Sequence, residues 1–152
     1  MAHILKLLHS AVSFVHIDRI LDFYRDALGL DLLFGPTSEA AGEELSRSLG
    51  VEDTRLRQAV LRIPGTDNQI ELLEYSGVPR PAERQLPQNA PGHAHIAFQV
   101  DDMVTMIDRL EREGVDFFPG PTRIDEGPLA GWTWLYLKDP EGTVIELVEI
   151  GK

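Results

Sequence analysis

The sequence predicts an α+β fold in which two tandem βαβββ modules form a curved mixed sheet. The main observation is an internal repeat: HSAVSF, a helical stretch and an FGP corner are followed later by HIAFQV, a second helical stretch and FFPGP. Each half then closes on nearly the same strand, IELLEY at residues 70–75 and IELVEI at residues 145–150. A chain that repeats one supersecondary unit predicts two copies of one architecture.

The two helices are predicted from apolar residues at helical spacing. The first stretch begins at Asp18 and stops at Gly29, and the second begins at Asp102 and stops at Gly114. Aspartate is a favoured N-cap residue, and glycine readily takes the left-handed conformation that often ends a helix. We therefore expect both aspartates to act as N-caps.

Three strands are expected after each helix, because short runs of branched and aromatic residues bounded by turns are typical of strands. The last two strands of the second half are joined by Asp139-Pro140-Glu141-Gly142, which places Pro and Gly where a type I turn favours them. The expected strands are residues 30–34, 56–63 and 69–75 in the first half and residues 115–119, 131–137 and 143–150 in the second.

One domain is predicted, with module 1 at about residues 5–76 and module 2 at about residues 93–151. Residues 77–92 contain four prolines and form the expected linker. The first module is longer than the second, and its surplus lies in residues 37–55, where we expect an inserted polar helix or lid.

Composition limits the classes of function. A formal net charge of −11 disfavours nucleic acid and anionic membranes as partners, because phosphate binding requires a basic surface. No apolar run is long enough to cross a bilayer, and the N-terminus lacks the pattern of a signal peptide. The absence of cysteine excludes disulfides and zinc–thiolate sites. We expect a cytoplasmic protein that acts on a small molecule.

Strand alternation places four candidate metal ligands on one side of the sheet. In the opening strands, His9 and His95 lie opposite the large apolar residues, and in the closing strands so do Glu71 and Glu146. If the apolar sides pack against the helices, all four side chains line a concave face. Imidazole and carboxylate together suit Zn, Ni, Co, Fe or Mn, so we expect one divalent metal ion in a cavity there.

Each of these residues taken alone also fits an ordinary structural role, because a histidine at a strand start is usually partly exposed and a glutamate near a strand end is usually solvated. Glu74 and Glu149 lie in the same two strands and are only weakly separated from Glu71 and Glu146 by periodicity. The recurrence of the same residue types at equivalent places in both halves favours the metal site.

The chain resembles the vicinal oxygen chelate superfamily, which includes glyoxalase I, methylmalonyl-CoA epimerase, extradiol dioxygenases and bleomycin-resistance proteins. The segments that carry the resemblance are HSAVSFVHIDRILDFYRDALGL, GHAHIAFQVDD and KDPEGTVIELVEI. The resemblance implies a glyoxalase-like fold with His9, Glu71, His95 and Glu146 as ligands. A set of four protein ligands resembles the isomerase and lyase branches, which move a proton next to a metal-chelated carbonyl or hydroxyl.

The resemblance also suggests catalytic and substrate-binding residues. Glu146 or Glu71 would be the base, with Glu43 and Glu44 as weaker candidates. Where glyoxalase I has an arginine and an asparagine for glutathione, this chain has Ser13 and Tyr75, which implies a less charged substrate. The side chains expected to contact it are Tyr75, Gln99, Trp132, Trp134 and Tyr136.

Two other functions stay open at this stage. One is an Fe(II)-dependent dioxygenase of the extradiol type, and the other is a non-catalytic small-molecule binding protein of the bleomycin-resistance type. Members of the superfamily build the site within one chain or across a dimer, and we expect a homodimer.

Overall fold

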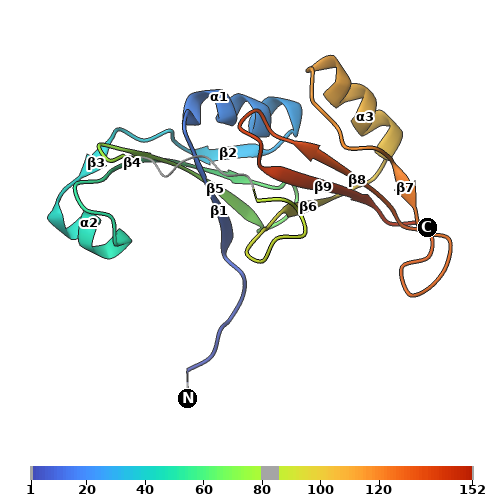
Figure 1. Ribbon diagram of the computed structural model, residues 1–152, viewed down its shortest axis with the longest axis horizontal. Coiled ribbons are helices and arrows are strands. Elements are labelled where there is room, and N and C mark those ends of the chain that lie inside the picture. The colour runs from blue at the N-terminus through green and yellow to red at the C-terminus, as the bar shows by residue number, and fades with distance from the viewer. Residues whose placement is uncertain (1, 80–85, 152) are drawn as a thin grey trace. The chain divides into compact units, whose positions relative to one another are not determined.

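The computed structural model describes residues 2–79 and 86–151, and the chain divides into two compact units, residues 1–82 and 83–152. Each unit contains one of the two predicted modules. The central part of the predicted linker, residues 80–85, lies outside the described residues. Each unit carries its principal helix on one face of its own mixed β-sheet, which confirms the α+β class (Figure 1).

The first unit contains a five-stranded sheet in the order β1-β5-β4-β2, with β3 paired to β4. Strands β1 and β5 are parallel, and the other pairs are antiparallel. The elements are β1 (His9–Phe14), α1 (Ile17–Asp22), the π-helix η1 (Phe23–Ala27), β2 (Asp31–Phe34), β3 (Ala40–Ala41), α2 (Glu43–Leu49), β4 (Arg55–Arg62) and β5 (Gln69–Ser76).

The second unit contains a four-stranded sheet in the order β6-β9-β8-β7, with β6 and β9 parallel. In both sheets the first strand of the unit lies at one edge and pairs in parallel with the last strand of that unit. Its elements are β6 (Ile96–Val100), α3 (Met103–Arg112), β7 (Thr122–Arg123), β8 (Thr133–Lys138) and β9 (Val144–Glu149).

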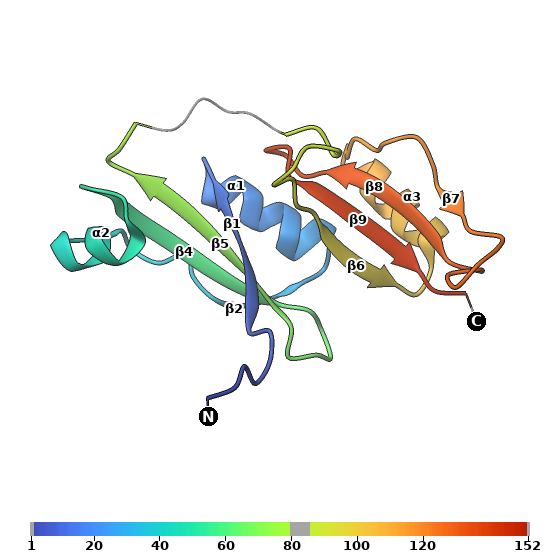
Figure 2. The same ribbon diagram turned by 60° about the horizontal axis from the view of Figure 1, so that its bottom comes forward.

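Each sheet has one buried face and one more open face, as the alternation predicts. In β1, Phe14 is buried whereas His9, Ala11 and Ser13 are exposed, and β6 repeats this alternation. The buried side chains pack between sheet and helix, since α1 contacts β4 and β5 and α3 contacts β9. In Figure 2, turned by 60°, α1 lies behind the strands of the first unit's sheet. No helix in the described residues is long and apolar enough to span a bilayer.

The start of the first helix differs from the prediction. The helix begins at Ile17, its N-cap is His16, and the His16 side chain makes no capping hydrogen bond. Asp18 instead receives two hydrogen bonds from the Arg57 guanidinium, at 3.0 and 3.1 Å. The pairing with Arg57 on β4, far away in sequence, thus replaces the local capping role that was expected. In α3 the prediction is confirmed, because Asp102 accepts a hydrogen bond from the Thr105 N–H at 2.9 Å.

The strand predicted at residues 115–119 is also wrong. Only an isolated bridge between Phe117 and Leu137 forms there, and the strand that pairs with β8 is β7. Pro119 and Pro121 have no N–H group and so cannot donate to a sheet ladder. The regular ladder therefore begins beyond the proline corner.

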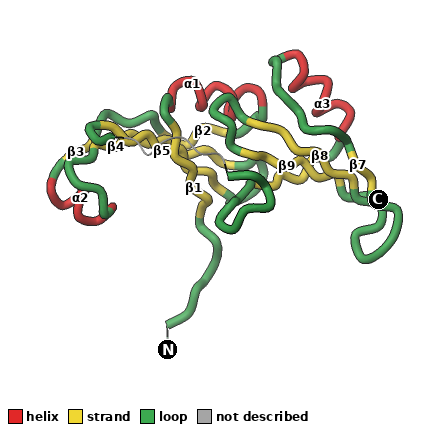
Figure 3. Tube along the Cα trace, viewed as in Figure 1, coloured by secondary structure: helices red, strands yellow, loops and turns green. Residues whose placement is uncertain are grey.

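The predicted insertion does contain a polar helix, α2, which has no buried residue. Together with β3 it makes up the regular structure between β2 and β4 (Figure 3). Its role as a lid stays a prediction.

Candidate functional site

The first candidate pair of ligands is formed by β1 and β5. These strands run parallel with Ala11 in register with Glu71, so His9, two residues before Ala11, shares the open face with that glutamate. His9 Nε2 lies 3.3 Å from Glu71 Oε2, and the two side chains are 40% and 18% exposed. Residues 62 positions apart in sequence are therefore brought together by strand pairing.

The second pair repeats this arrangement in the other unit. Ala97 of β6 is in register with Glu146 of β9, and His95 precedes β6. His95 Nε2 lies 3.0 Å from Glu146 Oε2, and the side chains are 38% and 17% exposed. Both units thus present an imidazole nitrogen next to a carboxylate oxygen, with nearly the same exposure.

Glu74 and Glu149, which periodicity separated only weakly from the candidate ligands, have a different role. Glu74 Oε2 accepts a hydrogen bond from the Ile17 N–H at 2.8 Å, and Glu149 Oε2 accepts one from the Met103 N–H at 2.6 Å. Each carboxylate therefore binds the first N–H group of the helix in its own module, where a negative charge is favourable. The two remaining glutamates of these strands, Glu71 and Glu146, are the ones that face the histidines.

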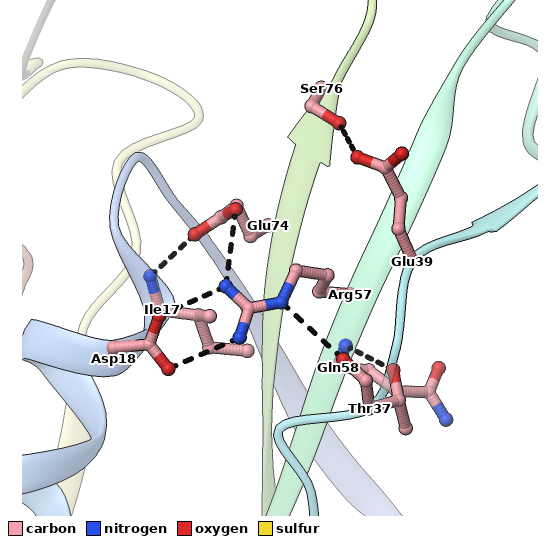
Figure 4. A network of polar contacts seen from close by, with 8 residues as sticks. All are labelled: Ile17, Asp18, Thr37, Glu39, Arg57, Gln58, Glu74 and Ser76. Atoms are coloured by element: carbon pink, nitrogen blue, oxygen red, sulfur yellow. Dashed lines mark hydrogen bonds and ion pairs between the residues drawn. The ribbon is translucent and has the colours of Figure 1, made fainter.

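The helix-binding glutamate of the first unit belongs to a polar network on the helix side of the sheet (Figure 4). Arg57 contacts Asp18 and lies 3.6 Å from Glu74. The hydrogen bond from Arg57 lowers the pKa of Asp18, and the opposing effect of burial is smaller. This network holds α1 on the sheet and is separate from the histidine face.

Three of the predicted substrate-binding residues of the second unit lie on the face of Glu146. Tyr136 is paired directly with Glu146, and Trp134 is paired with Val148 on the same side. Gln99 of β6 is also in register with Val148. Trp132 lies just before β8, and its N–H donates to the Leu129 carbonyl at 3.0 Å.

In the first unit, Tyr75 lies on β5 in register with Leu56 and shares the alternation of Glu71. The placement of these residues on the histidine faces thus agrees with the alternation, and their contact with a substrate stays a prediction.

Tyr136 lies beside the second His–Glu pair, His95 and Glu146. Its ring lies edge-on to the His95 imidazole, with centroids 5.4 Å apart and planes at 88°. Burial raises the pKa of Tyr136, and the charge of Glu146 and a hydrogen bond to that carboxylate raise it further. These effects favour the protonated, uncharged form of the hydroxyl beside Glu146.

A hollow that the sequence did not indicate lies beside α2 in the first unit. It has a volume of about 1040 Å³ and contains none of the four candidate ligands. Thr54, one of its lining residues, is 1% exposed, and its Oγ1 has no hydrogen-bond partner among the described residues. The other lining residues are Ala41, Gly42, Glu43, Ser46, Arg47, Gly50, Glu52, Asp53, Arg55 and Gly77.

The donor chemistry of the two pairs fits a divalent cation. Imidazole nitrogen and carboxylate oxygen are the ligands that Zn and neighbouring transition metals take in proteins. Across residues 2–79 and 86–151, no group of three or more His, Cys, Asp or Glu side chains is close enough to hold a metal ion. The donors that the structure brings together are two pairs, and the four-ligand site stays a prediction.

Comparison with known proteins bears on this arrangement. A family model described as "Glyoxalase/Bleomycin resistance protein/Dioxygenase superfamily" matches residues 6–147. A 2-epi-5-epi-valiolone epimerase from an Actinomyces species is 32% identical over 145 residues, covering 93% of this chain and 78% of that protein. A lactoylglutathione lyase from Haemophilus influenzae is 27% identical over 148 residues, covering 95% of this chain and 93% of the lyase.

Solved structures show the same fold. A glyoxalase family protein from Bacillus cereus superposes with a TM-score of 0.85 at 23% identity, covering 99% of this chain and 97% of that one. An antibiotic binding protein from a Streptomyces species superposes with a TM-score of 0.63 at 22% identity, covering 99% of this chain and 100% of that one. At such identities the likeness concerns the fold alone.

Proposed function

Because the chain belongs to the Glyoxalase/Bleomycin resistance protein/Dioxygenase superfamily, we propose that it is a divalent-metal-dependent epimerase. Its reaction is the transfer of a proton at a carbon next to the carbonyl group of a small polyhydroxylated molecule. The observation that carries the proposal is the His–Glu pair that recurs in both units, at 3.3 and 3.0 Å. The epimerase relative at 32% identity supports this reaction over the other reactions of the superfamily.

The residues that would hold the metal are His9, Glu71, His95 and Glu146. A bound divalent cation acts as a Lewis acid, which makes the hydrogen on the carbon beside a carbonyl more acidic. Zn, Ni, Co, Fe and Mn all accept this donor set, so the donors do not choose among them. Neutral imidazole and ionised carboxylate are needed for binding, so metal affinity should fall as the pH is lowered.

The chain's own carboxylates would carry the proton. Epimerisation breaks a C–H bond on one face of the carbon and restores it on the other, so it requires a base beside that carbon. Glu71 and Glu146 lie on the open faces of their sheets and are only 18% and 17% exposed, which lets a carboxylate meet substrate with little surrounding water. The structure favours these two over Glu43, which lines the hollow at α2 instead.

The surrounding side chains favour a neutral substrate rich in hydroxyl groups. Ser13, Tyr75 and Gln99 offer hydroxyl and amide groups that both donate and accept hydrogen bonds. Trp134 and Tyr136 add aromatic surface on the face of Glu146, against which the apolar face of a ring can pack. Ser13 and Tyr75 also stand where the superfamily resemblance implies glutathione anchors, which argues against a glutathione adduct.

The proposal is tested with apo-protein reloaded with Co(II), Ni(II) or Zn(II), and 2-epi-5-epi-valiolone as substrate in D₂O. NMR should show deuterium entering the epimerised carbon only when metal is present. Glu71→Gln and Glu146→Gln should each lower this rate by about 100-fold or more. Glu111→Gln, which changes an exposed residue of α3, is the matched control and should leave the rate unchanged.

Three results would contradict the proposal. The first is a protein that binds no divalent metal stoichiometrically. The second is tight binding of 2-epi-5-epi-valiolone without deuterium exchange, whether or not metal is present, which would indicate a binding protein. The third is iron-dependent consumption of O₂ with a catechol, which would indicate a dioxygenase.

We also propose that the protein is a homodimer. Near the N-terminus, Ile4, Leu5, Leu7 and Leu8 are 96%, 94%, 76% and 56% exposed. They lead into β1, which is the edge strand of its own sheet. An exposed apolar segment beside an open sheet edge favours association with another chain. A second copy is the natural partner, because one edge can pair with itself across a twofold axis.

A further inference from the structure

The two His–Glu pairs differ in the residue that lies across the sheet from the glutamate. In the second unit the residue paired across the sheet with Glu146 is Tyr136. In the first unit the residue paired with Glu71 is Val60. Directly opposed residues of antiparallel strands lie on the same face and in contact range. One glutamate therefore has a phenol beside it, and the other has an apolar side chain.

Glu146 is held from two directions. His95 Nε2 lies 3.0 Å from Glu146 Oε2, and Tyr136 lies directly across the strand pair from the same glutamate. Tyr136 is itself fixed by edge-on contacts with His95 at 5.4 Å and with Phe118 at 6.3 Å between ring centroids. An aromatic residue packed on two sides has little freedom, so its hydroxyl provides a steady donor.

Glu71 is held less firmly. His9 Nε2 lies farther from it, at 3.3 Å. Val60 is 6% exposed and has no polar side-chain atom with which to orient the carboxylate. The Glu71 carboxylate can therefore turn about its terminal bonds without breaking a hydrogen bond to the neighbouring strand.

We propose that Tyr136 is a positioning residue whose hydroxyl fixes the Glu146 carboxylate as a metal ligand. This inference rests on the proposed function.

The positioning role is tested with Tyr136→Phe, which removes the hydroxyl and keeps the ring beside His95. Co(II) affinity is measured by titration of the apo-protein, and the Co(II) absorption spectrum reports the ligand arrangement independently of activity. Loss of a hydrogen bond to a metal ligand typically weakens metal binding by about 10-fold or more. We expect a loss of this size and a changed spectrum, whereas a merely structural role would leave the spectrum of the folded variant unchanged.

Double-mutant cycles show which glutamate Tyr136 serves. Tyr136→Phe should add little further loss of Co(II) affinity in Glu146→Gln, because the hydroxyl then has no carboxylate to hold. In Glu71→Gln it should produce the same loss as in the wild type, because the residue paired with Glu71 is Val60 and not Tyr136. Part of the deuterium-exchange activity of Tyr136→Phe should return at high Co(II) concentration, because the variant keeps the Glu146 carboxylate.

Each outcome separates this inference from the proposed function. If the wild type binds no Co(II), the proposed function fails. If the wild type binds Co(II) and exchanges deuterium, but Tyr136→Phe has unchanged affinity and spectrum, the positioning role is wrong. Coupling to Glu71 instead of Glu146 would also overturn it. If Tyr136→Phe does not fold, Tyr136→Gln supplies a donor on a non-aromatic side chain, and its coupling to Glu146→Gln gives the same decision.

Discussion

The Glu149 carboxylate accepts a hydrogen bond from the backbone N–H of Met103, at 2.6 Å, so the last strand of the second unit binds the first N–H group of its helix. In the first unit Glu74 makes the same contact with Ile17. The repeat thus preserves two glutamates per module with separate roles. One binds the helix on the packed face, and the other faces a histidine on the open face.

The helix-binding glutamates should contribute to stability and leave metal binding intact. Glu149→Ala removes a charged acceptor from a helix N-terminus and should lower the free energy of unfolding by about 1 to 2 kcal/mol. Urea unfolding followed by circular dichroism measures this change. Glu111→Ala, at an exposed position of α3, is the control and should stay within about 0.5 kcal/mol of the wild type. A loss of Co(II) affinity in Glu149→Ala with unchanged stability would contradict the assignment.

Much of this arrangement was predictable, because alternation depends only on which residues are large and apolar. The exposed side of β1 and the buried side of β9 follow directly from Phe14, Ile145 and Leu147. The helix start did not follow, because Asp18 is a good N-cap by local rules. Its actual partner, Arg57, is 39 residues away, and a pairing of that range leaves no local signal.

The site was predictable to a similar extent. The repeat indicates that a histidine and a glutamate recur, and strand pairing brings each pair together. Glu74 shares the parity of Leu72, which places it on the packed face, but its role there depends on the Ile17 N–H, a partner 57 residues away in sequence. The contrast between Tyr136 and Val60 depends on register, which the sequence does not specify.

The ion pair between Asp18 and Arg57 should make stability depend on acid pH. Arg57 lowers the pKa of Asp18 in the folded protein, so the folded state binds this proton less readily than the unfolded chain. The stabilisation is present above the unfolded pKa of about 4 and is lost as the pH falls through the folded pKa. Asp18→Asn should therefore be less stable than the wild type at pH 7, with the difference shrinking below about pH 4.

Thermal unfolding of Asp18→Asn from neutral to acid pH measures this convergence. Asp67→Asn, at an exposed aspartate between β4 and β5, is the matched control and should leave the pH profile close to that of the wild type. A constant difference between Asp18→Asn and the wild type at every pH would show that Asp18 acts through something other than its charge.

The corner after β2 should tolerate no side chain at Gly35. Its φ of +94° is unfavourable for other residues, and a Cβ there would lie 2.4 Å from the Gln58 carbonyl oxygen and 2.7 Å from the Ala59 Cα. Gly35→Ala should thus be destabilised by about 3 kcal/mol or more, since overpacking adds to the backbone strain. Gly65→Ala has a similar φ of +76° with nothing within 4 Å, and should lose only about 1 kcal/mol. Equal losses in denaturant unfolding would contradict the close approach at Gly35.

The proposed homodimer should depend on the exposed N-terminal segment. Leu5 and Leu7 are 94% and 76% exposed, and burying them against a second copy would stabilise association by about 1.5 to 3 kcal/mol for each side chain. Replacing both with Asp puts charge where apolar contact is needed, in a chain that already carries a net charge of −11. Sedimentation equilibrium of Leu5→Asp/Leu7→Asp should therefore show a monomer at concentrations where the wild type is a dimer.

The control for this prediction is Leu129→Asp, a change of the same kind at a leucine that is 44% exposed and lies between β7 and β8. It should leave the dimer intact, because it is remote in sequence from the β1 edge. If the wild type is monomeric, the segment has another role. If both variants dissociate to the same extent, general charge repulsion is the cause. A specific contact through the β1 edge would be lost in Leu5→Asp/Leu7→Asp and kept in Leu129→Asp.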